Sequence, residues 1–558
     1  MAITVASRRL RIGFGAQPLS LVCAIVALLL AVPVLTVVAS LLVPPDSVMS
    51  HVVATVLPRY ITNTLGLIGG VGAGVLILGV GTAWLVTMCR FPTSRVCEWA
   101  MLMPMAVPAY LLAYTYTSWL DVGGPVQAWI RVTFQVSVRN YWFPQVRSLE
   151  GAVVMLTLAL FPYVYLLARA AFLEQSVCAL EVSRTLGYGP WASFRRVALP
   201  LARPSIVAGL SLALMETLAD FGTVQYFGLD TFTTGIFRSW YGMDSKATAA
   251  QLSAVLLLLV AGIIVMERWS RGRAKYHHTS SRYSTLRPYR LTGLKALGAS
   301  LFCWLPILLG FILPAGLLIK MTQSGGDQLF GANFLRFVSN SLVLAGIACL
   351  VAVVLATILA YTLRLHPGGL ARFAATVGTM GYAVPGSIIA VGVLLTLGRF
   401  DNALDGWVRT TLGVSTGLLL SGTGFALIYA YQARFLAVAF NAVEASLSKI
   451  KPGFDDAART LGTTPFGTLQ RVHTPLMRGS LFTAMLMVFV DVIKELPATI
   501  IVRPFNFDTL AVRVYQLASD ERLTEASTAA LAIVIAGTVP VIVLSRAIAR
   551  ARPGEVNG

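Results

Sequence analysis

Residues 181–205 read EVSRTLGYGPWASFRRVALPLARPS, and residues 456–480 read DAARTLGTTPFGTLQRVHTPLMRGS. A single ungapped offset, which sets Glu181 against Asp456, aligns the two stretches, and from Arg184 against Arg459 onward eleven of 22 positions are identical. Unrelated stretches of this length would share about one or two positions, so the chain contains an internal repeat.

Each copy is predicted to form two short helices joined by a turn. Gly187 and Gly462 follow the first helix and suit the left-handed conformation that often ends a helix. Pro190 and Pro465 suit the first position of the second helix, where a missing N–H costs nothing. The repeated loops therefore have the same predicted local structure.

The second helix of each copy has an apolar residue at every third position, which predicts one apolar stripe. We expect Pro200 and Pro475 to break this helix before a long apolar segment begins. Polar identities are retained beside the stripe, which favours a protein-docking surface over a loop that only lies on the membrane. The stripe residues are Trp191, Phe194 and Val197 in copy one, and Phe466, Leu469 and Val472 in copy two.

The composition is that of a membrane protein. The 558 residues are 56% hydrophobic and 12% charged, with a mean hydropathy of +0.76. A soluble protein carries about twice that charged fraction. Apolar stretches long enough to cross a bilayer recur along the chain, so we expect a polytopic helical protein without a cleavable signal peptide. The six cysteines and five histidines show no metal-binding or disulfide spacing.

The repeat extends over both halves of the chain and predicts six spans in each. Asn63 and Asn340 open the second span of their halves, at almost the same offset as the repeated loops. The third spans are expected at Cys97–Leu120 and Ala374–Leu397, and each contains the tripeptide Ala-Val-Pro. The fifth span is followed by a related loop that begins at Asp230 or at Asp508. The predicted fold is all-α, with two parallel six-helix repeats and about twelve transmembrane helices.

Lysine and arginine positions predict the orientation. With alternating spans, the side that carries the repeated loops holds 29 of the 43 basic residues, and the opposite side holds 13. The positive-inside rule then places both loops, the Arg268–Lys295 linker and both termini in the cytoplasm. This topology accounts for the net charge of +19 without nucleic acid as a partner.

Both loops resemble the EAA loop of membrane subunits in ABC importers, which docks into a cleft of a cytoplasmic ATPase. Copy one departs from that pattern with Val182 and Ser183 in place of two alanines. Copy two has Asp456 in place of glutamate and Thr474 in place of leucine. The resemblance implies a permease in the inner membrane of a bacterial cell, which binds two copies of a separate ATPase. It implies coupling roles for Glu181, Arg184, Gly187 and Pro200 in copy one, and for Asp456, Ala457, Ala458, Arg459, Gly462 and Pro475 in copy two.

No phosphate-binding loop or catalytic constellation occurs in the sequence, so we expect no enzyme activity and no bound cofactor; a partner subunit would use the ATP. The unusual residues are acids inside the fifth spans. Glu216 and Asp220 correspond to Asp491 and Glu495 at the same offset as the repeated loops. Each pair is spaced i, i+4 and shares a helix face. Carboxylates at membrane depth either brace the bundle or line a path for a cation; Lys494, beside Glu495, weakens the second interpretation for that half.

A closer resemblance concerns the segments around these acids. Residues 218–224 (LADFGTV) and 494–499 (KELPAT) look like the two halves of fused permeases from ferric-iron ABC importers. This family implies delivery of Fe3+ by a periplasmic or surface-anchored binding protein. The same machine carrying thiamine, a polyamine or sulfate is the alternative, and an ion-coupled secondary transporter is a more distant one. The metal ligands, if any, stay unassigned.

The predicted domain organisation follows the repeat. The two permease domains occupy residues 61–267 and 337–546. The remaining segments are an N-terminal segment with the first helix at 1–60, a basic linker with the first helix of the second half at 268–336, and a tail at 547–558.

Overall fold

The computed structural model describes residues 18–174, 183, 185, 187–271, 288–326 and 331–550. These residues are almost entirely helical; one parallel pairing joins β1 (Cys89–Arg90) to β2 (Tyr289–Arg290). Eleven helices are long and apolar enough to cross a membrane, or twelve if one bent pair is counted as a span. The predicted all-α membrane protein with about twelve transmembrane helices is confirmed.

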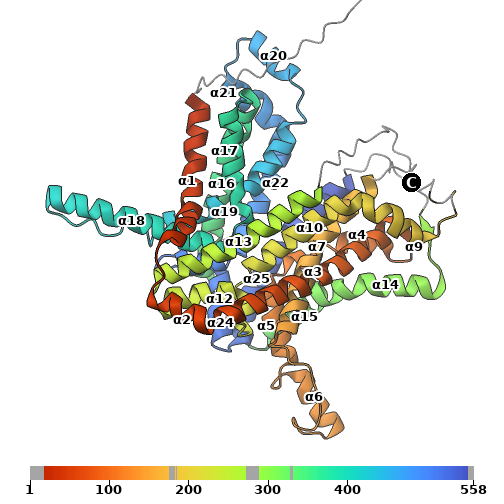
Figure 1. Cartoon of the computed structure of the whole chain (residues 1–558). Coiled ribbons are helices and arrows are strands. Elements are labelled where there is room, and N and C mark those ends of the chain that lie inside the picture. The colour runs from red at the N-terminus through yellow and green to blue at the C-terminus, as the bar shows by residue number, and fades with distance from the viewer. Residues whose placement is uncertain are drawn as a thin grey trace, which may run out of the picture.

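The helices follow the same order in both halves (Figure 1). The first half contains α1 (Pro18–Ala39), α2 (Ser47–Thr55), α3 (Leu57–Met88), α4 (Ser94–Ala100), α5 (Ala109–Leu120), α6 (Pro125–Phe134), α7 (Leu149–Glu174), α9 (Pro190–Ser193), α10 (Leu199–Ala219), α11 (Gly222–Tyr226), α12 (Phe232–Phe237) and α13 (Lys246–Arg271). The second half contains α14 (Gly293–Ile307), α15 (Leu313–Gly325), α16 (Ala332–Leu365), α17 (Gly369–Thr379), α18 (Gly386–Leu412), α19 (Gly424–Leu447), α20 (Gly453–Thr460), α21 (Pro465–Thr468), α22 (Thr474–Ile493), α23 (Pro497–Val502), α24 (Leu510–Ser519) and α25 (Leu523–Arg550).

Short 3-10 and π segments connect several of these helices. The 3-10 turns are η1 (Ser40–Leu42), η2 (Met103–Ala106) and η6 (Met380–Ala383), and the π turns are η3 (Phe194–Ala198), η4 (Arg238–Gly242), η5 (Leu308–Ile312) and η7 (Leu469–His473).

A pair of asparagine contacts shows that the sequence repeat is also a structural repeat. The Asn63 side-chain amide donates a hydrogen bond to the backbone carbonyl of Asp230 at 2.9 Å. The Asn340 amide donates to the carbonyl of Asp508 at 3.0 Å. Each bond ties the start of a second span to the loop after the fifth span of the same half.

The third span of each half is broken, which corrects the prediction of continuous spans at Cys97–Leu120 and Ala374–Leu397. Val107 and Val384 have extended backbones, with φ/ψ of −104/109° and −86/124°. A proline follows each valine, and its ring disfavours helical geometry in the residue before it. In the first half the helical segments on either side of the break are bent by 89°.

Pro200 and Pro475 do not break their helices, contrary to the prediction. The chain continues through them in helices of 30 and 29 residues that begin at Pro190 and Pro465. The π turns η3 and η7 lie just before these prolines. A proline ring clashes with the carbonyl four residues earlier in a regular helix, and a π turn shifts that carbonyl out of register.

The first helix of each half packs against the opposite half (Figure 1). In the first half, α1 lies against α17 and α18, and Thr36 hydrogen-bonds to Thr396 of α18 at 3.0 Å. In the second, α14 and α15 lie against α3, α4 and α5, and the Tyr116 hydroxyl donates to the Leu309 carbonyl in η5 at 2.7 Å. The two halves therefore clasp each other.

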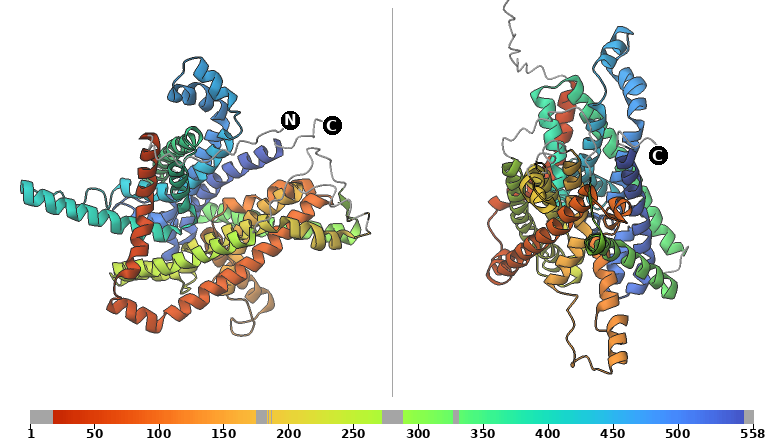
Figure 2. Two further views of the ribbon diagram at one scale, coloured as in Figure 1. Left: turned by 45° about the horizontal axis from the view of Figure 1, so that its top comes forward. Right: turned by 90° about the vertical axis from the view of Figure 1, so that its right-hand side faces the viewer.

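Other segments extend away from this clasped body. The helices α6 and the end of α18 project from it, one from each half (Figure 2). The helices of the repeated loops, α9 in one half and α20 with α21 in the other, lie at ends remote from α2, α12 and α24 and stand apart from each other (Figure 1). The body between these extremes contains the charged residues described next.

Candidate functional site

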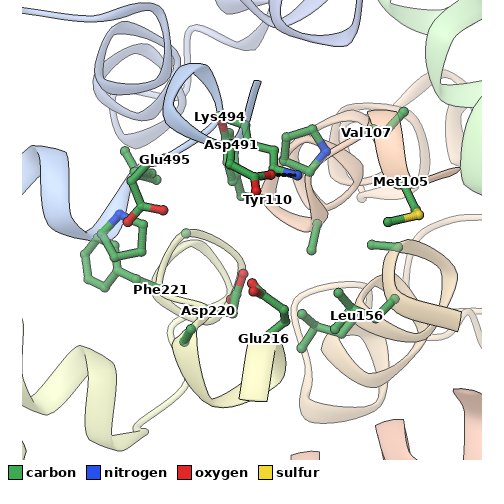
Figure 3. A pocket seen from close by; sticks show the side chains of 18 of the residues that line it. Met105, Val107, Tyr110, Leu156, Glu216, Asp220, Phe221, Asp491, Lys494 and Glu495 are labelled. Atoms are coloured by element: carbon green, nitrogen blue, oxygen red, sulfur yellow. Dashed lines mark ion pairs between the residues drawn. The ribbon is translucent and has the colours of Figure 1, made fainter. Parts of the chain in front are cut away.

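A cavity of about 120 Å³ lies between the two halves. Its walls come from η2, α5, α7 and α10 of the first half, and from η6, α19 and α22 of the second. The four acids predicted from the fifth spans, Glu216, Asp220, Asp491 and Glu495, all line it. Figure 3 shows their carboxylates turned toward the same space. The offset that relates these acids in the sequence therefore also relates side chains that line one cavity.

One acid of each pair caps a short helix. The Asp220 carboxylate accepts hydrogen bonds from the backbone N–H groups of Thr223 (3.1 Å) and Val224 (3.2 Å) at the start of α11. The Glu495 carboxylate accepts from the backbone N–H of Ala498 at 3.1 Å, at the start of α23. Asp220 directly follows the last residue of α10, and Glu495 comes two residues after the end of α22. Each carboxylate satisfies N–H groups at the start of the next short helix.

The other two acids are less constrained by the backbone. Glu216 lies in the last turn of α10 and Asp491 in the last turn of α22. Their side chains are 28% and 20% exposed, against 6% for Glu495. No backbone hydrogen bond to either carboxylate occurs among the described residues, so these two are the acids whose position the side-chain partners set.

Two basic side chains share the cavity. Arg434 of α19 forms an ion pair with Glu495 at 2.9 Å and approaches Glu216 of the other half at 3.8 Å. Lys494 pairs with Asp491 at 2.8 Å. With all six groups ionised, acids outnumber bases by two. Lys494 was among the intramembrane residues predicted from the sequence and Arg434 was not, although a charged residue beside a long apolar run is itself a signal for such a site.

Three tyrosines add hydroxyl groups to the cavity wall: Tyr110, Tyr163 and Tyr382. The Tyr110 hydroxyl is buried and has no hydrogen-bond partner in the described part of the chain. Within the same residues, no group of three or more His, Cys, Asp or Glu side chains is placed to hold a metal ion. The oxygen atoms that the cavity could offer as metal ligands belong to carboxylates and phenols, and such ligands suit hard cations.

The glycines of the repeated loops have the predicted left-handed backbone, with φ of +80° at Gly187 and +76° at Gly462. No atom lies within 4 Å of where a Cβ would stand at either position. A side chain there would meet backbone strain and no steric clash. Glu181 and Arg184, two further residues of copy one, lie outside the described residues.

Copy two presents most of its predicted coupling residues to the surface. Asp456, Ala457 and Arg459 of α20 are exposed, and only Ala458 faces inward, at 4% exposure. The Asp456 carboxylate has a single weak ion pair, at 3.9 Å with Arg459. Pro475 is exposed like Pro200, its counterpart in copy one.

A neighbouring acid fixes α20 to the membrane helices. The Asp455 carboxylate pairs with the Arg364 guanidinium and with the His473 imidazole, 2.8 Å away. Arg364, at the end of α16, also donates to the backbone carbonyl of Ile450 at 2.9 Å. Burial alone would raise the pKa of Asp455, but hydrogen bonds from Arg364 and His473 hold it below its ordinary value.

The apolar stripe of each loop is only partly buried. Phe194 is 9% exposed, whereas Trp191, one turn earlier, is 66% exposed. In copy two the equivalent Phe466 is 72% exposed, and Leu461 beside Gly462 is 82% exposed. A largely exposed aromatic side chain therefore occupies the same position in both loops. Exposed apolar side chains beside polar ones are typical of protein-interaction surfaces.

Comparison with known proteins gives these features a context. Residues 75–271 match the family described as binding-protein-dependent transport system inner membrane component. The chain is 27% identical over 500 residues to the Fe(3+)-transport system permease protein FbpB 2 of Haemophilus influenzae, covering 87% of this chain and 89% of that protein.

Two further relatives show how far the similarity extends. The ferric transport system permease protein FbpB of Actinobacillus pleuropneumoniae is 21% identical, with 82% of this chain and 66% of that protein covered. The sulfate transport system permease protein CysT of Escherichia coli K12 is 27% identical over 200 residues, which cover 34% of this chain and 69% of that protein.

Proposed function

We propose that this chain, a membrane permease subunit of a binding-protein-dependent ABC importer, carries ferric iron through the cavity between its two halves. The observation that carries the proposal is the convergence of four repeat-related acids on that one cavity. Two relatives that are similar along 87% and 82% of this chain are named as Fe(3+) or ferric transport permeases, which supports iron as the cargo.

The charge of the cavity favours a cation over an oxyanion. A sulfate permease is among the partial relatives, and Arg434 with Lys494 could serve an anion. The carboxylates outnumber these two bases, and both bases are already paired with acids at less than 3 Å. An anion entering such a site would meet uncompensated negative charge at low dielectric, so we do not favour an anionic cargo.

Energy for transport would come from a separate ATPase, because no phosphate-binding loop occurs in the sequence. Two ATPase subunits would dock on the two repeated loops at the cytoplasmic face, where the basic residues place them. The exposed Trp191 and Phe466 are suited to fill pockets on those subunits. A binding protein would deliver the iron from the opposite side, and this chain would bind no cofactor.

The test combines Glu216→Gln with Asp491→Asn, because these two acids have no capping role. We expect normal membrane abundance, loss of radioactive-iron uptake, and loss of the ATPase stimulation by loaded binding protein. Glu444→Gln, which changes an exposed carboxylate at the end of α19, is the matched control and should leave uptake unchanged.

Three results would count against the proposal. Unchanged iron uptake in the double variant rejects a required role for this pair. Reduced membrane abundance with normal uptake per molecule shows that the acids only brace the bundle. Uptake of sulfate, and not of iron, by the wild-type complex would show that the proposed cargo is wrong.

A further inference from the structure

We propose that Arg434 and Lys494 are tethered cations that occupy the carboxylates of the cavity when no cargo is present, so that cargo must displace them to pass. This inference rests on the proposed function, since it assumes that a cation crosses the cavity. It assigns to the two bases the role of a gate that keeps the empty passage closed.

The two bases break the symmetry of the repeat. At the offset that relates the four acids, Arg434 corresponds to Ala159 and Lys494 corresponds to Ala219. Both alanines line the same cavity. The acids are therefore contributed equally by the two halves, whereas both bases come from the second half. These two bases can therefore approach a first-half acid only by reaching across the interface between the halves.

Arg434 is placed to make that reach. Its guanidinium pairs with Glu495 of its own half at 2.9 Å and lies 3.8 Å from Glu216 of the other half. Its Nε has no hydrogen-bond partner among the described residues, and the side chain is 6% exposed. A guanidinium has five N–H donors in a fixed fork. Because one donor of Arg434 is unused, the side chain can shift between Glu495 and Glu216 without losing all of its hydrogen bonds.

The absence of a side chain at Gly386 leaves room for the ion pair of Arg434 and Glu495. Gly386, the first residue of α18, lies against both the guanidinium of Arg434 and the carboxylate of Glu495. A Cβ at that position would collide with both groups. The glycine therefore lets two buried charged groups meet at the edge of the cavity.

Lys494 acts on the second free carboxylate. It lies three residues after Asp491 and pairs with it at 2.8 Å, while its side chain is 29% exposed (Figure 3). A lysine stem has several rotatable bonds, so the ammonium can leave the carboxylate and return without movement of the helix. Among the described residues, Glu216 has only the longer contact with Arg434, and Asp220 has no basic partner at all.

Electrostatics explains why such a gate would open for the proposed cargo. Carboxylates at membrane depth are costly unless a positive charge is near, and the tethered cations supply it in the empty state. At equal distance and dielectric constant a trivalent cation attracts each carboxylate three times as strongly as a guanidinium. Once the cargo moves on, the tethered cations re-pair with the acids and oppose its return.

The test uses the permease purified with its ATPase and reconstituted in vesicles that contain an iron-quenched fluorophore. Ferric nitrilotriacetate is added outside without binding protein. We expect Arg434→Gln and Lys494→Gln each to raise iron entry about fivefold or more, the low end for coupling between sites. Basal ATPase activity should rise with it, and Arg434→Lys, which keeps the positive charge, should leak less than Arg434→Gln.

A buried arginine elsewhere provides the matched control. Arg169 of α7 pairs with Glu98 outside the cavity and is 5% exposed. Arg169→Gln should lower the thermal stability of the complex and leave iron entry unchanged. Lower stability without a leak in Arg434→Gln as well would show that Arg434 only braces the bundle, and would overturn the inference.

A second variant keeps the inference testable if Arg434→Gln does not fold. Ala219→Lys places a base three residues after Glu216, in the relation that Lys494 has to Asp491. The added cation should neutralise Glu216 and reduce delivered iron uptake, and unchanged uptake would overturn the gate. A wild-type complex that imports no iron from loaded binding protein would instead refute the proposed function, while basal ATPase activity still reports on the gate.

Discussion

At the scale of single residues, the four cavity acids divide into two kinds. Asp220 and Glu495 each cap a short helix after their long one, so their carboxylates are fixed by backbone N–H groups. Glu216 and Asp491 have only side-chain partners, and those partners are bases. Bracing and transport are therefore compatible, because different members of each pair would perform them. Substitution of a capping acid should affect folding first.

A residue-scale prediction concerns Asp455, which ties α20 to Arg364 and His473. Asp455→Asn should weaken attachment of the loop by about 2 kcal/mol at pH 7, the usual worth of hydrogen bonds to a charged group. Since the folded-state pKa is lowered, this stabilisation is present above the unfolded pKa of about 4 and is lost as pH falls through the folded value.

Thermal unfolding of wild type and Asp455→Asn in detergent, from pH 7 down to about pH 3, tests whether the stabilisation by Asp455 is lost in acid. The difference between the two proteins should shrink below about pH 4. Asp456→Asn, which changes the exposed neighbouring acid, should show little difference at any pH. A gap between wild type and Asp455→Asn that persists or grows in acid would contradict the account.

At the scale of elements, each repeated loop joins its membrane helix through a π turn. The turns η3 and η7 occupy equivalent positions and precede the exposed prolines Pro200 and Pro475. Together with the left-handed glycines, they allow a loop helix to enter a transmembrane helix without a break. A continuous helix thus runs from each loop to the end of the fifth span, where the cavity acids lie.

An element-scale prediction concerns the glycine turn. Replacing Gly187 and Gly462 together by valine should strain both turns by about 1–2 kcal/mol each, because a side chain disfavours the left-handed region. There is open space around both positions, so the effect should come from the backbone alone. We expect reduced ATPase co-purification and reduced uptake.

The double Gly→Asn variant is the control for that experiment. Asparagine adds a side chain of similar reach but tolerates the left-handed conformation, so assembly should be largely retained. Normal assembly and normal uptake in the valine variant would exclude the coupling role that the loop resemblance implies.

At the scale of the whole molecule, the sequence predicts those features that repeat. The nearly constant offset between the halves identified the loops, the left-handed glycines and the four acids of the fifth spans. Arg434 has no counterpart in the first half, so comparison of the repeats did not find it. The break at Val107 was not predicted, because hydropathy favoured a continuous span and the one proline that disfavours helix there was outweighed by the long apolar run. The packing of α1 against the other half could not be predicted either, because a helix that is apolar on all sides does not indicate which neighbour it contacts.

That crossing has a consequence for assembly. Because α1 packs on α17 and α18 while α14 packs on α3 and α4, each half completes the other. A permease with one repeat per chain would need a second subunit for this, whereas here one chain supplies both halves and both docking loops. A second copy of the chain would have no unfilled first-helix position to occupy.

The last prediction is therefore one permease chain of 59.8 kDa with two ATPase subunits. Native mass determination of the complex in detergent checks it directly. Gly462→Val alone should weaken one docking site and give complexes with a single ATPase at low protein concentration, because Gly187 still holds the other loop in shape. A complex that contains two copies of this chain, or one that keeps two ATPases as firmly after Gly462→Val, would show that the fused halves are not the two docking partners.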